Sequence, residues 1–248
     1  MKANKKSQIT IYIIIALVII ASVILILFLR NKTVNQIDSQ NPENYISSCV
    51  GNAATKALDI ILPQGGYASP ALYKLYNNTK IAYLCYNPGW YMPCINQEPM
   101  YVEHLEQEIK EIIAGKLDYC FDSLKQSLEK RNYQVNIKNG DFSVNLIPNK
   151  VKIDISREII LEKNQDVKKY ENFSVIVLSP IYELAGIALE ITDKEARNCD
   201  FDYSAYKNNY PKYNIDRTFT DDNTRVYTIG NEIKLNFATR SCALPGAF

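Results

Sequence analysis

Residues Tyr133–Ile155 read YQVNIKNGDFSVNLIPNKVKIDI, and apolar side chains occupy alternate positions through most of this stretch. A period of two is typical of a β-strand that buries one face. Two turn signals interrupt the alternation, Asn139-Gly140 and Pro148-Asn149-Lys150. Asn-Gly between alternating runs is the strongest short signal for a hairpin. The stretch therefore predicts an antiparallel meander of three strands that turns at both positions.

Two amphipathic helices are predicted before this meander. In the first, from Glu43 to Ile61, apolar residues recur at intervals of three and four, and Pro63-Gln64-Gly65-Gly66 follows as a stop signal. The second runs from about Glu98 to Cys120, and it either kinks near Gly115 or continues to residue 128. Because helices precede strands, the order predicts an α+β fold with helices packed on an antiparallel sheet.

Shorter patterns complete the predicted domain. It covers residues 43–248, with a helical part at 43–130 and a mainly sheet part at 131–248. Further strands are predicted before the turn at Asn87-Pro88-Gly89 and before Ser179-Pro180, which begins a third helix. Residues 198–214 read as a long loop. Outside the meander, the last two predicted strands form a final hairpin. These strands are Ile81–Tyr86, Phe173–Leu178, Arg225–Ile229 and Glu232–Phe237.

An uncharged run, ITIYIIIALVIIASVILILFL, occupies the 21 positions from Ile9 to Leu29. About 20 helical residues cross the hydrocarbon core of a bilayer. The run is too long for the apolar region of a cleaved signal peptide, and no small-residue cleavage site follows it. We therefore expect a cytoplasmic segment at 1–8, a transmembrane helix at 9–29 in contact with the bilayer, and a linker at 30–42.

Charges on the two sides of this run predict its orientation. Lys2, Lys5, Lys6 and the amino group precede it, whereas Arg30 and Lys32 follow. This bias places the N-terminus in the cytoplasm and the rest of the chain outside a cytoplasmic membrane that it crosses once. After the first 30 residues the chain has 24 basic and 27 acidic residues, a net charge of −3. Such a mildly acidic domain argues against nucleic-acid binding, which requires a basic face.

All six cysteines follow the apolar run, as expected for disulfides in an extracytoplasmic domain. Sequence alone does not select a pairing, but the predicted elements favour joining the two helices, closing one short loop and tying down the C-terminus. A tight hairpin at Pro88-Gly89 would not bring the second pair together, so that pairing needs a wide loop. Zinc is disfavoured because no C-x-x-C pair occurs. The expected pairs are Cys49 with Cys120, Cys85 with Cys94, and Cys199 with Cys242.

Several short motifs together resemble a known group of proteins. They are the KKSQITI start, the cysteine-bearing helix that ends in Gln64-Gly65-Gly66-Tyr67, the acidic helix that closes on Cys120, and the strand Leu235-Asn236-Phe237-Ala238. This layout resembles uncharacterised membrane-anchored secreted or surface proteins of small-genome archaea. The resemblance implies a cell-surface role and no known chemistry.

The start of the chain also resembles a class III, type IV pilin-like signal sequence. By that resemblance a peptidase would cut between Ser7 and Gln8 and leave the apolar helix attached. The family usually has glycine where this chain has Ser7. Two sequons of an outer domain are glycosylation candidates, at Asn77 and Asn172, whereas Asn31 lies too close to the predicted membrane.

The best binding candidate is Trp90-Tyr91-Met92, which holds the only tryptophan and lies between Cys85 and Cys94. Aromatic side chains on a constrained loop are typical binding anchors, because little entropy is lost on contact. The alternative is that Trp90 folds back onto the core, as large aromatic residues commonly do.

Catalytic signals are not found in this sequence. There is no H-E-x-x-H, no G-x-S-x-G and no glycine-rich phosphate loop. The single histidine, His104, reads as a solvated helix residue, and the pairs Asp200/Asp202 and Asp221/Asp222 lack the ligand spacing of known calcium loops. We expect no catalytic residue, no metal and no cofactor.

Three functions stay open on this evidence. The leading hypothesis is a non-enzymatic surface protein that binds an unknown surface protein or glycan, for adhesion or envelope assembly. The second is a type IV pilin-like subunit. The third is a surface enzyme with an unrecognised carboxylate site.

Overall fold

A computed structural model describes residues 15, 17–20, 41–209 and 211–245. The chain divides into two compact units, 1–39 and 40–248, and the second is described below. Ser7, Gln8, Asn31 and most of the predicted anchor at 9–29 lie outside the described residues; Ile15 and Leu17–Ile20 are helical and exposed. Within the described part of the chain, no helix is long and apolar enough to cross a bilayer. The transmembrane helix thus stays a prediction.

Helix α2 (Pro42–Ile61) begins at a strong cap, because the Asn41 side chain accepts the N–H groups of Glu43 at 3.0 Å and Asn44 at 3.4 Å. Its predicted apolar stripe is buried, and it ends in a short 3₁₀ turn, η1 (Leu62–Gln64), followed by Gly65 at φ 77°.

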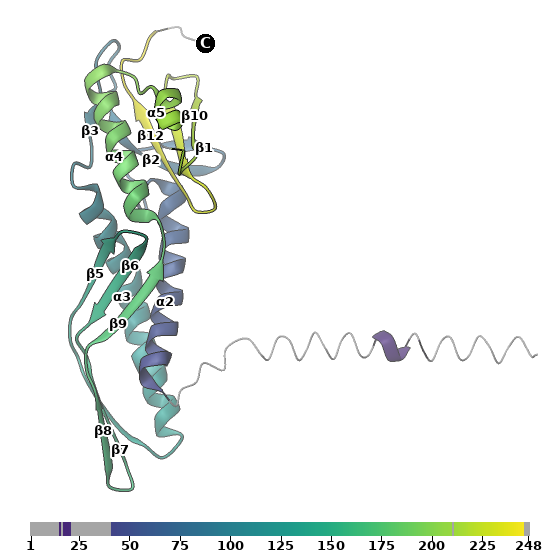
Figure 1. Ribbon diagram of the computed structural model, residues 1–248, viewed down its shortest axis with the longest axis vertical. Coiled ribbons are helices and arrows are strands. Elements are labelled where there is room, and N and C mark those ends of the chain that lie inside the picture. Colours follow the sequence, from purple (N-terminus) through teal and green to yellow (C-terminus); the bar gives the residue numbers. More distant parts are fainter. Residues whose placement is uncertain (1–14, 16, 21–40, 210, 246–248) are drawn as a thin grey trace, which may run out of the picture. The chain divides into compact units, whose positions relative to one another are not determined.

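Helix α3 packs beside α2 (Figure 1) and is continuous from Tyr101 to Glu129. It therefore passes Gly115 without a break. The buried side chains of the two helices lie in one core together with the inner face of the meander.

The meander is longer than predicted. Its six strand segments pair as two three-stranded sheets, β4-β7-β8 and β5-β6-β9. The hairpin of β5 with β6 turns at Pro148-Asn149, as predicted, with Ile147 opposite Lys150. The bounds are β4 (Gln134–Lys138), β5 (Phe142–Ile147), β6 (Lys150–Ile155), β7 (Glu158–Lys163), β8 (Asp166–Tyr170) and β9 (Phe173–Leu178).

The predicted turn at Asn139-Gly140 is wrong. Strand β4 pairs with β7, not with β5, so the chain runs on through residues 139–141. Gly140 does not have the positive φ that a type I′ turn requires. Its role is close approach: an added Cβ would lie 1.6 Å from the carbonyl oxygen of Ser156, in the link between β6 and β7. An unpredicted turn lies at Asn164-Gln165, between β7 and β8, and both of its residues have positive φ.

The third sheet has six strands in the order β1-β2-β12-β11-β10, with β3 also paired to β2. The pairing of β2 with β12 is parallel, which corrects the predicted wholly antiparallel sheet. The predicted final hairpin is present as β11 and β12. The bounds are β1 (Tyr73–Tyr76), β2 (Thr79–Tyr86), β3 (Ile95–Asn96), β10 (Ile215–Phe219), β11 (Arg225–Gly230) and β12 (Lys234–Arg240).

Helix α4 (Ile181–Asn198) contacts β11 and β12 of this sheet. The predicted residues of its buried face, Ile181, Leu184, Ala188 and Ile191, are fully buried. The helix begins one residue later than predicted, with Pro180 at the N-cap position, and the Ser179 hydroxyl accepts the Ile181 N–H at 3.3 Å. A short helix, α5 (Tyr203–Asn209), lies in the stretch predicted as a loop.

All three predicted disulfides are present, and no cysteine is free. Cys49–Cys120 joins α2 to α3. Cys85–Cys94 closes the wide loop that this pairing requires, because β2 pairs with β3 and places Cys85 opposite Asn96. Cys199–Cys242 joins the end of α4 to the segment after β12.

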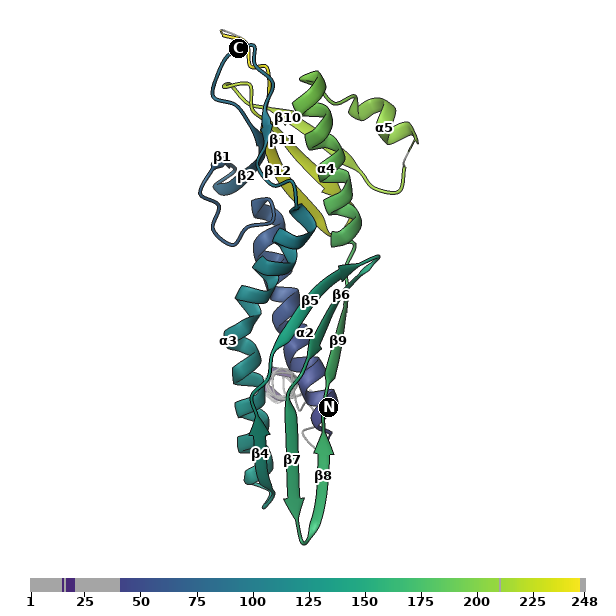
Figure 2. The ribbon, with the colours of Figure 1, turned by 90° about the vertical axis from the view of Figure 1, so that its left-hand side faces the viewer.

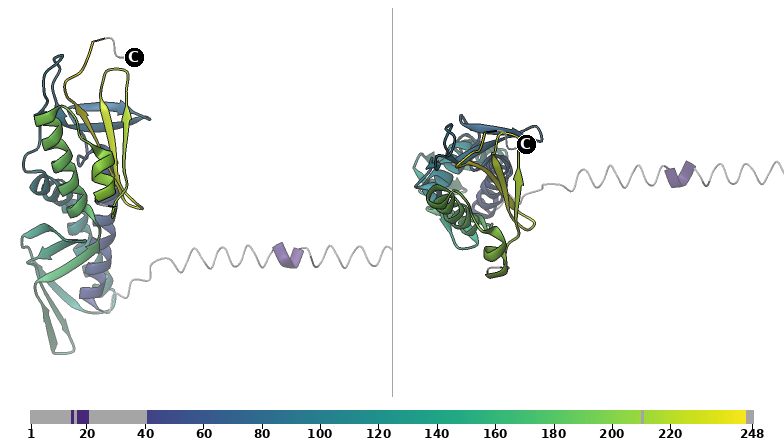
Figure 3. Two further views of the ribbon diagram at one scale, coloured as in Figure 1. Left: turned by 45° about the horizontal axis from the view of Figure 1, so that its top comes forward. Right: turned by 90° about the horizontal axis from the view of Figure 1, so that it is seen from above.

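The two ends of this domain differ in what they carry. Helix α2 begins at the end where β7 and β8 lie, whereas β3 and the end of β12 lie at the opposite end (Figures 1 and 2). The left-hand view of Figure 3 shows the same separation from a further direction. The chain thus enters the domain far from the loop that precedes β3.

Candidate binding surface

The loop at residues 87–94 is fixed from inside by its own polar groups. The Asn87 side chain accepts the Gly89 N–H at 2.8 Å and donates to the Pro93 carbonyl at 2.8 Å. Cys85–Cys94 closes the loop at its base. With both ends tied, the loop retains little conformational freedom to lose when a ligand binds.

Arg240 supports the loop from below. Its guanidinium carbon lies 4.9 Å from the Trp90 ring centroid, a cation–π geometry. The same group donates to the carbonyl oxygens of Asn87 at 2.5 Å and Asp222 at 3.1 Å. Arg240 is only 7% exposed, so its guanidinium group faces these contacts and not the solvent.

The segment after β12 runs beside the loop. The Tyr91 N–H donates to the Ala243 carbonyl at 2.9 Å, and the Cys242 N–H donates to the Met92 carbonyl at 2.8 Å. Trp90 forms an isolated parallel bridge with Ala243, which is buried. The backbone of Trp90, Tyr91 and Met92, named here the aromatic loop, is therefore held on two sides.

The side chains of the aromatic loop point outward. Trp90 is 47% exposed, Tyr91 67% and Met92 54%. Trp90 thus rests one ring face on Arg240 and does not fold into the core, which was the alternative interpretation. No charged residue occurs at 87–97 or at 241–248. Trp, Tyr and Met exposed together on an uncharged, rigid loop have the composition of a protein-interface core.

Asp222 anchors a neighbouring turn whose Asn223 amide donates to the Leu244 carbonyl at 3.0 Å. Partial burial alone would raise the pKa of Asp222. The hydrogen bond from Thr220 at 2.6 Å, the Lys74 ammonium at 2.9 Å and the Thr224 N–H outweigh burial and hold that pKa well below its ordinary value. The folded state therefore favours the charged form.

Replacing Asp222 by asparagine should lower stability at neutral pH and lower it by less in acid. A depressed pKa contributes stability that is fully present above the pKa of the unfolded chain, about 3.9, and that is lost progressively as the pH falls from there through the lower pKa of the folded state. Urea unfolding of D222N and wild type at pH 7 and at pH 3 measures the difference. Asp221→Asn is the control, because the Asp221 side chain is 84% exposed. A deficit of D222N that persists unchanged in acid would contradict the assignment.

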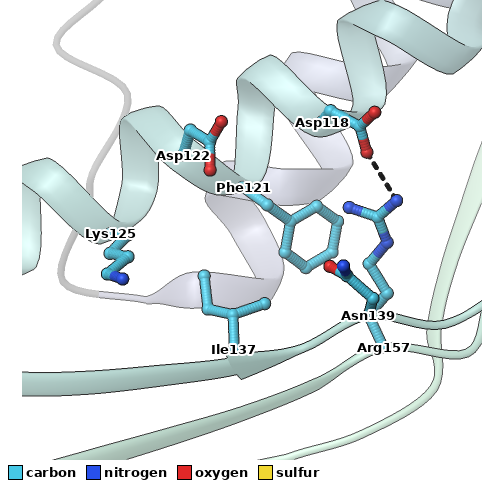
Figure 4. A pocket seen from close by; sticks show the side chains of 7 residues that line it. All are labelled: Asp118, Phe121, Asp122, Lys125, Ile137, Asn139 and Arg157. Atoms are coloured by element: carbon cyan, nitrogen blue, oxygen red, sulfur yellow. Dashed lines mark hydrogen bonds and ion pairs between the residues drawn. The ribbon is translucent and has the colours of Figure 1, made fainter.

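A groove of about 520 Å³ lies between α3 and two links of the meander (Figure 4). Residue 139 lies in the link between β4 and β5, and residue 157 lies in the link between β6 and β7. The Arg157 guanidinium donates to Asp118 at 2.6 Å, lies 5.0 Å from the Phe121 ring centroid and donates to the Gly140 carbonyl at 3.4 Å. Two acidic and two basic side chains balance its charge, and Arg157 is committed to structural contacts. Its lining is Asp118, Phe121, Asp122, Lys125, Ile137, Asn139 and Arg157.

Sequence reasoning missed this groove because its two walls come from elements far apart in the chain. The strand-period pattern marked Asn139 only as part of a turn. Among the described residues, no three His, Cys, Asp or Glu side chains are placed to hold a metal ion. The groove offers hydrogen bonds and an ion pair, but no nucleophile beside a base.

A buried ionic cluster holds α4 on the six-stranded sheet that contains β11. Glu195, fully buried, accepts a hydrogen bond from the Tyr227 hydroxyl at 2.5 Å and one from the Arg225 guanidinium. Burial raises the pKa of Glu195, and the Arg225 charge and the Tyr227 hydroxyl oppose that rise. A raised pKa is one sign of a catalytic carboxylate. Glu195 has no exposed surface for a substrate to reach, so the cluster acts in packing.

His104 is not the solvated residue that the sequence predicted. Its side chain is 16% exposed, and its ring centroid lies 4.1 Å from that of Tyr67. Nε2 lies 3.1 Å from the Gly66 carbonyl oxygen. With Nε2 protonated, His104 donates to this oxygen and fixes the corner after α2, where Gly66 has φ 86°.

The other candidate residues occupy turns. Asp200 pairs with Arg217 at 2.6 Å, so ion pairing accounts for it as it does for Asp222. Asn77 is exposed in the two-residue turn between β1 and β2. Asn172 is exposed between β8 and β9, and the hydroxyl of its sequon residue Ser174 donates to Asp154 at 2.9 Å. Of the two sequons, only that of Asn172 has a hydroxyl committed to a carboxylate.

Comparisons with protein-family models, curated proteins and solved structures find no match for this chain. The functional assignment therefore rests on the sites themselves.

Proposed function

We propose that this chain is a single-pass membrane protein of the cell surface, and that its disulfide-stapled domain binds a surface partner through the aromatic loop. The observation that carries the proposal is the exposure of Trp90, Tyr91 and Met92, at 47%, 67% and 54%, on a loop fixed by a disulfide and by Arg240. Exposed apolar side chains that are already ordered bind with a small entropic cost.

The location follows from sequence. The uncharged run at 9–29 matches the thickness of a bilayer, and the lysines before it favour a cytoplasmic N-terminus. Three disulfides suit an oxidising compartment. Because α2 begins at the end of the domain opposite β3, the chain enters far from the aromatic loop (Figure 1). This arrangement supports presentation of the loop to a partner.

The partner is a protein or a glycan of the cell envelope. Proteins and glycans can both pack against the faces of aromatic rings. The uncharged segments 87–97 and 241–248 favour an apolar contact over an ionic one. A non-catalytic role in adhesion or envelope assembly fits a rigid loop that carries no acid, base or nucleophile.

The triple variant W90A/Y91A/M92A should lose surface binding. Each truncated hot-spot residue costs about 2 kcal/mol, a factor of about 30 in affinity. The assay presents the full chain in lipid nanodiscs to cells that lack this protein and measures the apparent dissociation constant by flow cytometry. The matched control is V167A/I176A/L178A, whose side chains are 63%, 55% and 76% exposed elsewhere on the domain. Equal binding by both variants would refute the proposal.

Topology has a separate test. An epitope tag after Phe248 should be removed by protease added to intact cells, and a tag before Lys2 should survive until the membrane is permeabilised. Protection of the C-terminal tag in intact cells would overturn the orientation and, with it, the surface role.

The KKSQITI start supports a second candidate, a pilin-like subunit processed between Ser7 and Gln8. Mass spectrometry of the mature N-terminus decides it: a chain that begins at Gln8 is expected for the pilin-like subunit, and intact residues 1–8 exclude it. A surface enzyme is the third candidate. The groove carboxylates Asp118 and Asp122 would have to carry it, although Arg157 already engages Asp118.

A further inference from the structure

The three disulfides differ in their access to solvent. Cys85 and Cys94 are 0% and 4% exposed. In the first bridge Cys120 is 1% exposed, whereas Cys49 is half-buried. Cys199–Cys242 is the one bridge in which both residues are half-buried. Thiol–disulfide exchange requires a thiolate to reach a sulfur atom, so accessible disulfides are the ones that act in regulation. An external thiol should therefore reduce Cys199–Cys242 first.

The Cys199–Cys242 bridge also links α4 covalently to the segment that contacts the aromatic loop. Two hydrogen bonds join residues 241–244 to the aromatic loop. The Tyr91 N–H donates to the Ala243 carbonyl, and the Cys242 N–H donates to the Met92 carbonyl. Cys199 and Cys242 both have positive φ, 62° and 45°, a conformation that surrounding structure must hold in place for residues other than glycine. Once the covalent link is cut, the backbone at Cys242 is free to leave this conformation.

The loop itself would survive this reduction. Cys85–Cys94 is buried and closes the loop independently, and Arg240 still binds the carbonyl of Asn87. Ser241 stays attached through its hydroxyl, which donates to the Glu195 carbonyl at 2.8 Å. The expected effect is thus confined to the contacts beyond Ser241, namely those of Cys242 and Ala243 with the aromatic loop.

We propose that Cys199–Cys242 is a redox-controlled tether that sets the rigidity of the aromatic loop. A dithiol outside the cell attacks one sulfur, forms a mixed disulfide and then closes to its own cyclic disulfide. Two electrons and two protons pass to the protein, which gains thiols at Cys199 and Cys242. Reduction loosens the loop and weakens binding, because ordering the loop then opposes association. The inference rests on the proposed function only for this last consequence.

The first test is the order of reduction. Full-length protein in nanodiscs is titrated with dithiothreitol, free thiols are alkylated at each step, and labelled peptides are quantified by mass spectrometry. Cys199 and Cys242 should be labelled before the other four cysteines. Earlier labelling of Cys85 and Cys94, or of Cys49 and Cys120, would overturn the proposal.

The second test measures the loop without any partner. Hydrogen exchange of the backbone amides of Tyr91 and of residue 242 should be about tenfold faster in C199S/C242S than in wild type, because both amides are donors across this contact. Trp90, the only tryptophan, should report the same change by fluorescence. The control C49S/C120S removes a bridge from the α2–α3 pair and should leave both signals unchanged.

Unaltered exchange in C199S/C242S, or an equal change in C49S/C120S, would refute the tether. Neither readout depends on a binding partner. If W90A/Y91A/M92A kept full surface binding while the tether behaved as expected, only the proposed function would fail.

Discussion

Replacing Glu195 by glutamine is expected to lower the free energy of unfolding by about 3–5 kcal/mol, the typical cost of removing one partner from a buried ion pair. Glu195 is fully buried and accepts from both Arg225 and the Tyr227 hydroxyl. Glutamine preserves the shape but leaves the Arg225 charge uncompensated in a site that is 14% exposed. Urea unfolding of the full chain in detergent, followed by circular dichroism, measures the loss.

Two further variants separate charge from packing. Glu190→Gln lies on the same helix with an exposed side chain and should change stability by less than about 0.5 kcal/mol. The triple variant E195M/R225M/Y227F removes the three hydrogen-bonded partners together and should recover much of the loss, since apolar replacements of buried ion pairs are often neutral. A loss in E195Q no larger than that in E190Q would contradict the account of this cluster.

Replacing Gly140 by alanine is expected to destabilise the meander by about 1–3 kcal/mol, as overpacking does. The new Cβ would meet the Ser156 carbonyl oxygen at 1.6 Å and the carbonyl carbon at 2.7 Å, and both belong to backbone. The Ser156 N–H donates to the Asp141 carbonyl at 2.9 Å, so the link between β6 and β7 can move away only by giving up this hydrogen bond. Urea unfolding of the same full-length preparation measures the cost.

Two comparisons make this prediction specific. Gly115→Ala, at a helical glycine with open space around its Cβ position, should be stabilising by about 0.5–1 kcal/mol. Gly140→Asn distinguishes a close approach from a turn. Asparagine is tolerated in a type I′ turn, whereas here its Cβ meets Ser156 as alanine does. If G140N were as stable as wild type while G140A was not, residues 139–140 would form the hairpin turn after all.

The fold could be predicted wherever the signal was local. The stripe of α2, its glycine stop, the hairpin at Pro148-Asn149 and the buried face of α4 were all readable, because each element buries one face with a fixed period. The three disulfides that the predicted elements favoured are also present, although the sequence alone does not exclude the other pairings. Strands β1, β3, β7, β8 and β10 were missed, and β8 is exposed almost throughout, so it carries no apolar alternation.

The candidate site was only half predictable. The run Trp90-Tyr91-Met92 stood out by composition and by its place between two cysteines. Its exposure could not be read from sequence, because it depends on Arg240, which lies about 150 positions away and occupies the inner side of the Trp90 ring. The prediction that His104 is solvated was wrong for the same reason, because its partner, the Gly66 carbonyl, lies after the end of another helix.

By itself, the sequence determined the charge of the domain and most of its helices, and it favoured the cysteine pairing that is present; the anchor at 9–29 stays a prediction. Those properties depend on composition and on periods of two to four residues. The tertiary structure alone decided that Asn139-Gly140 runs straight, that β2 lies parallel to β12, and that the aromatic loop faces outward. Each of these depends on which distant segment lies opposite, and strand pairing is chosen by the burial of whole faces and not by a dipeptide.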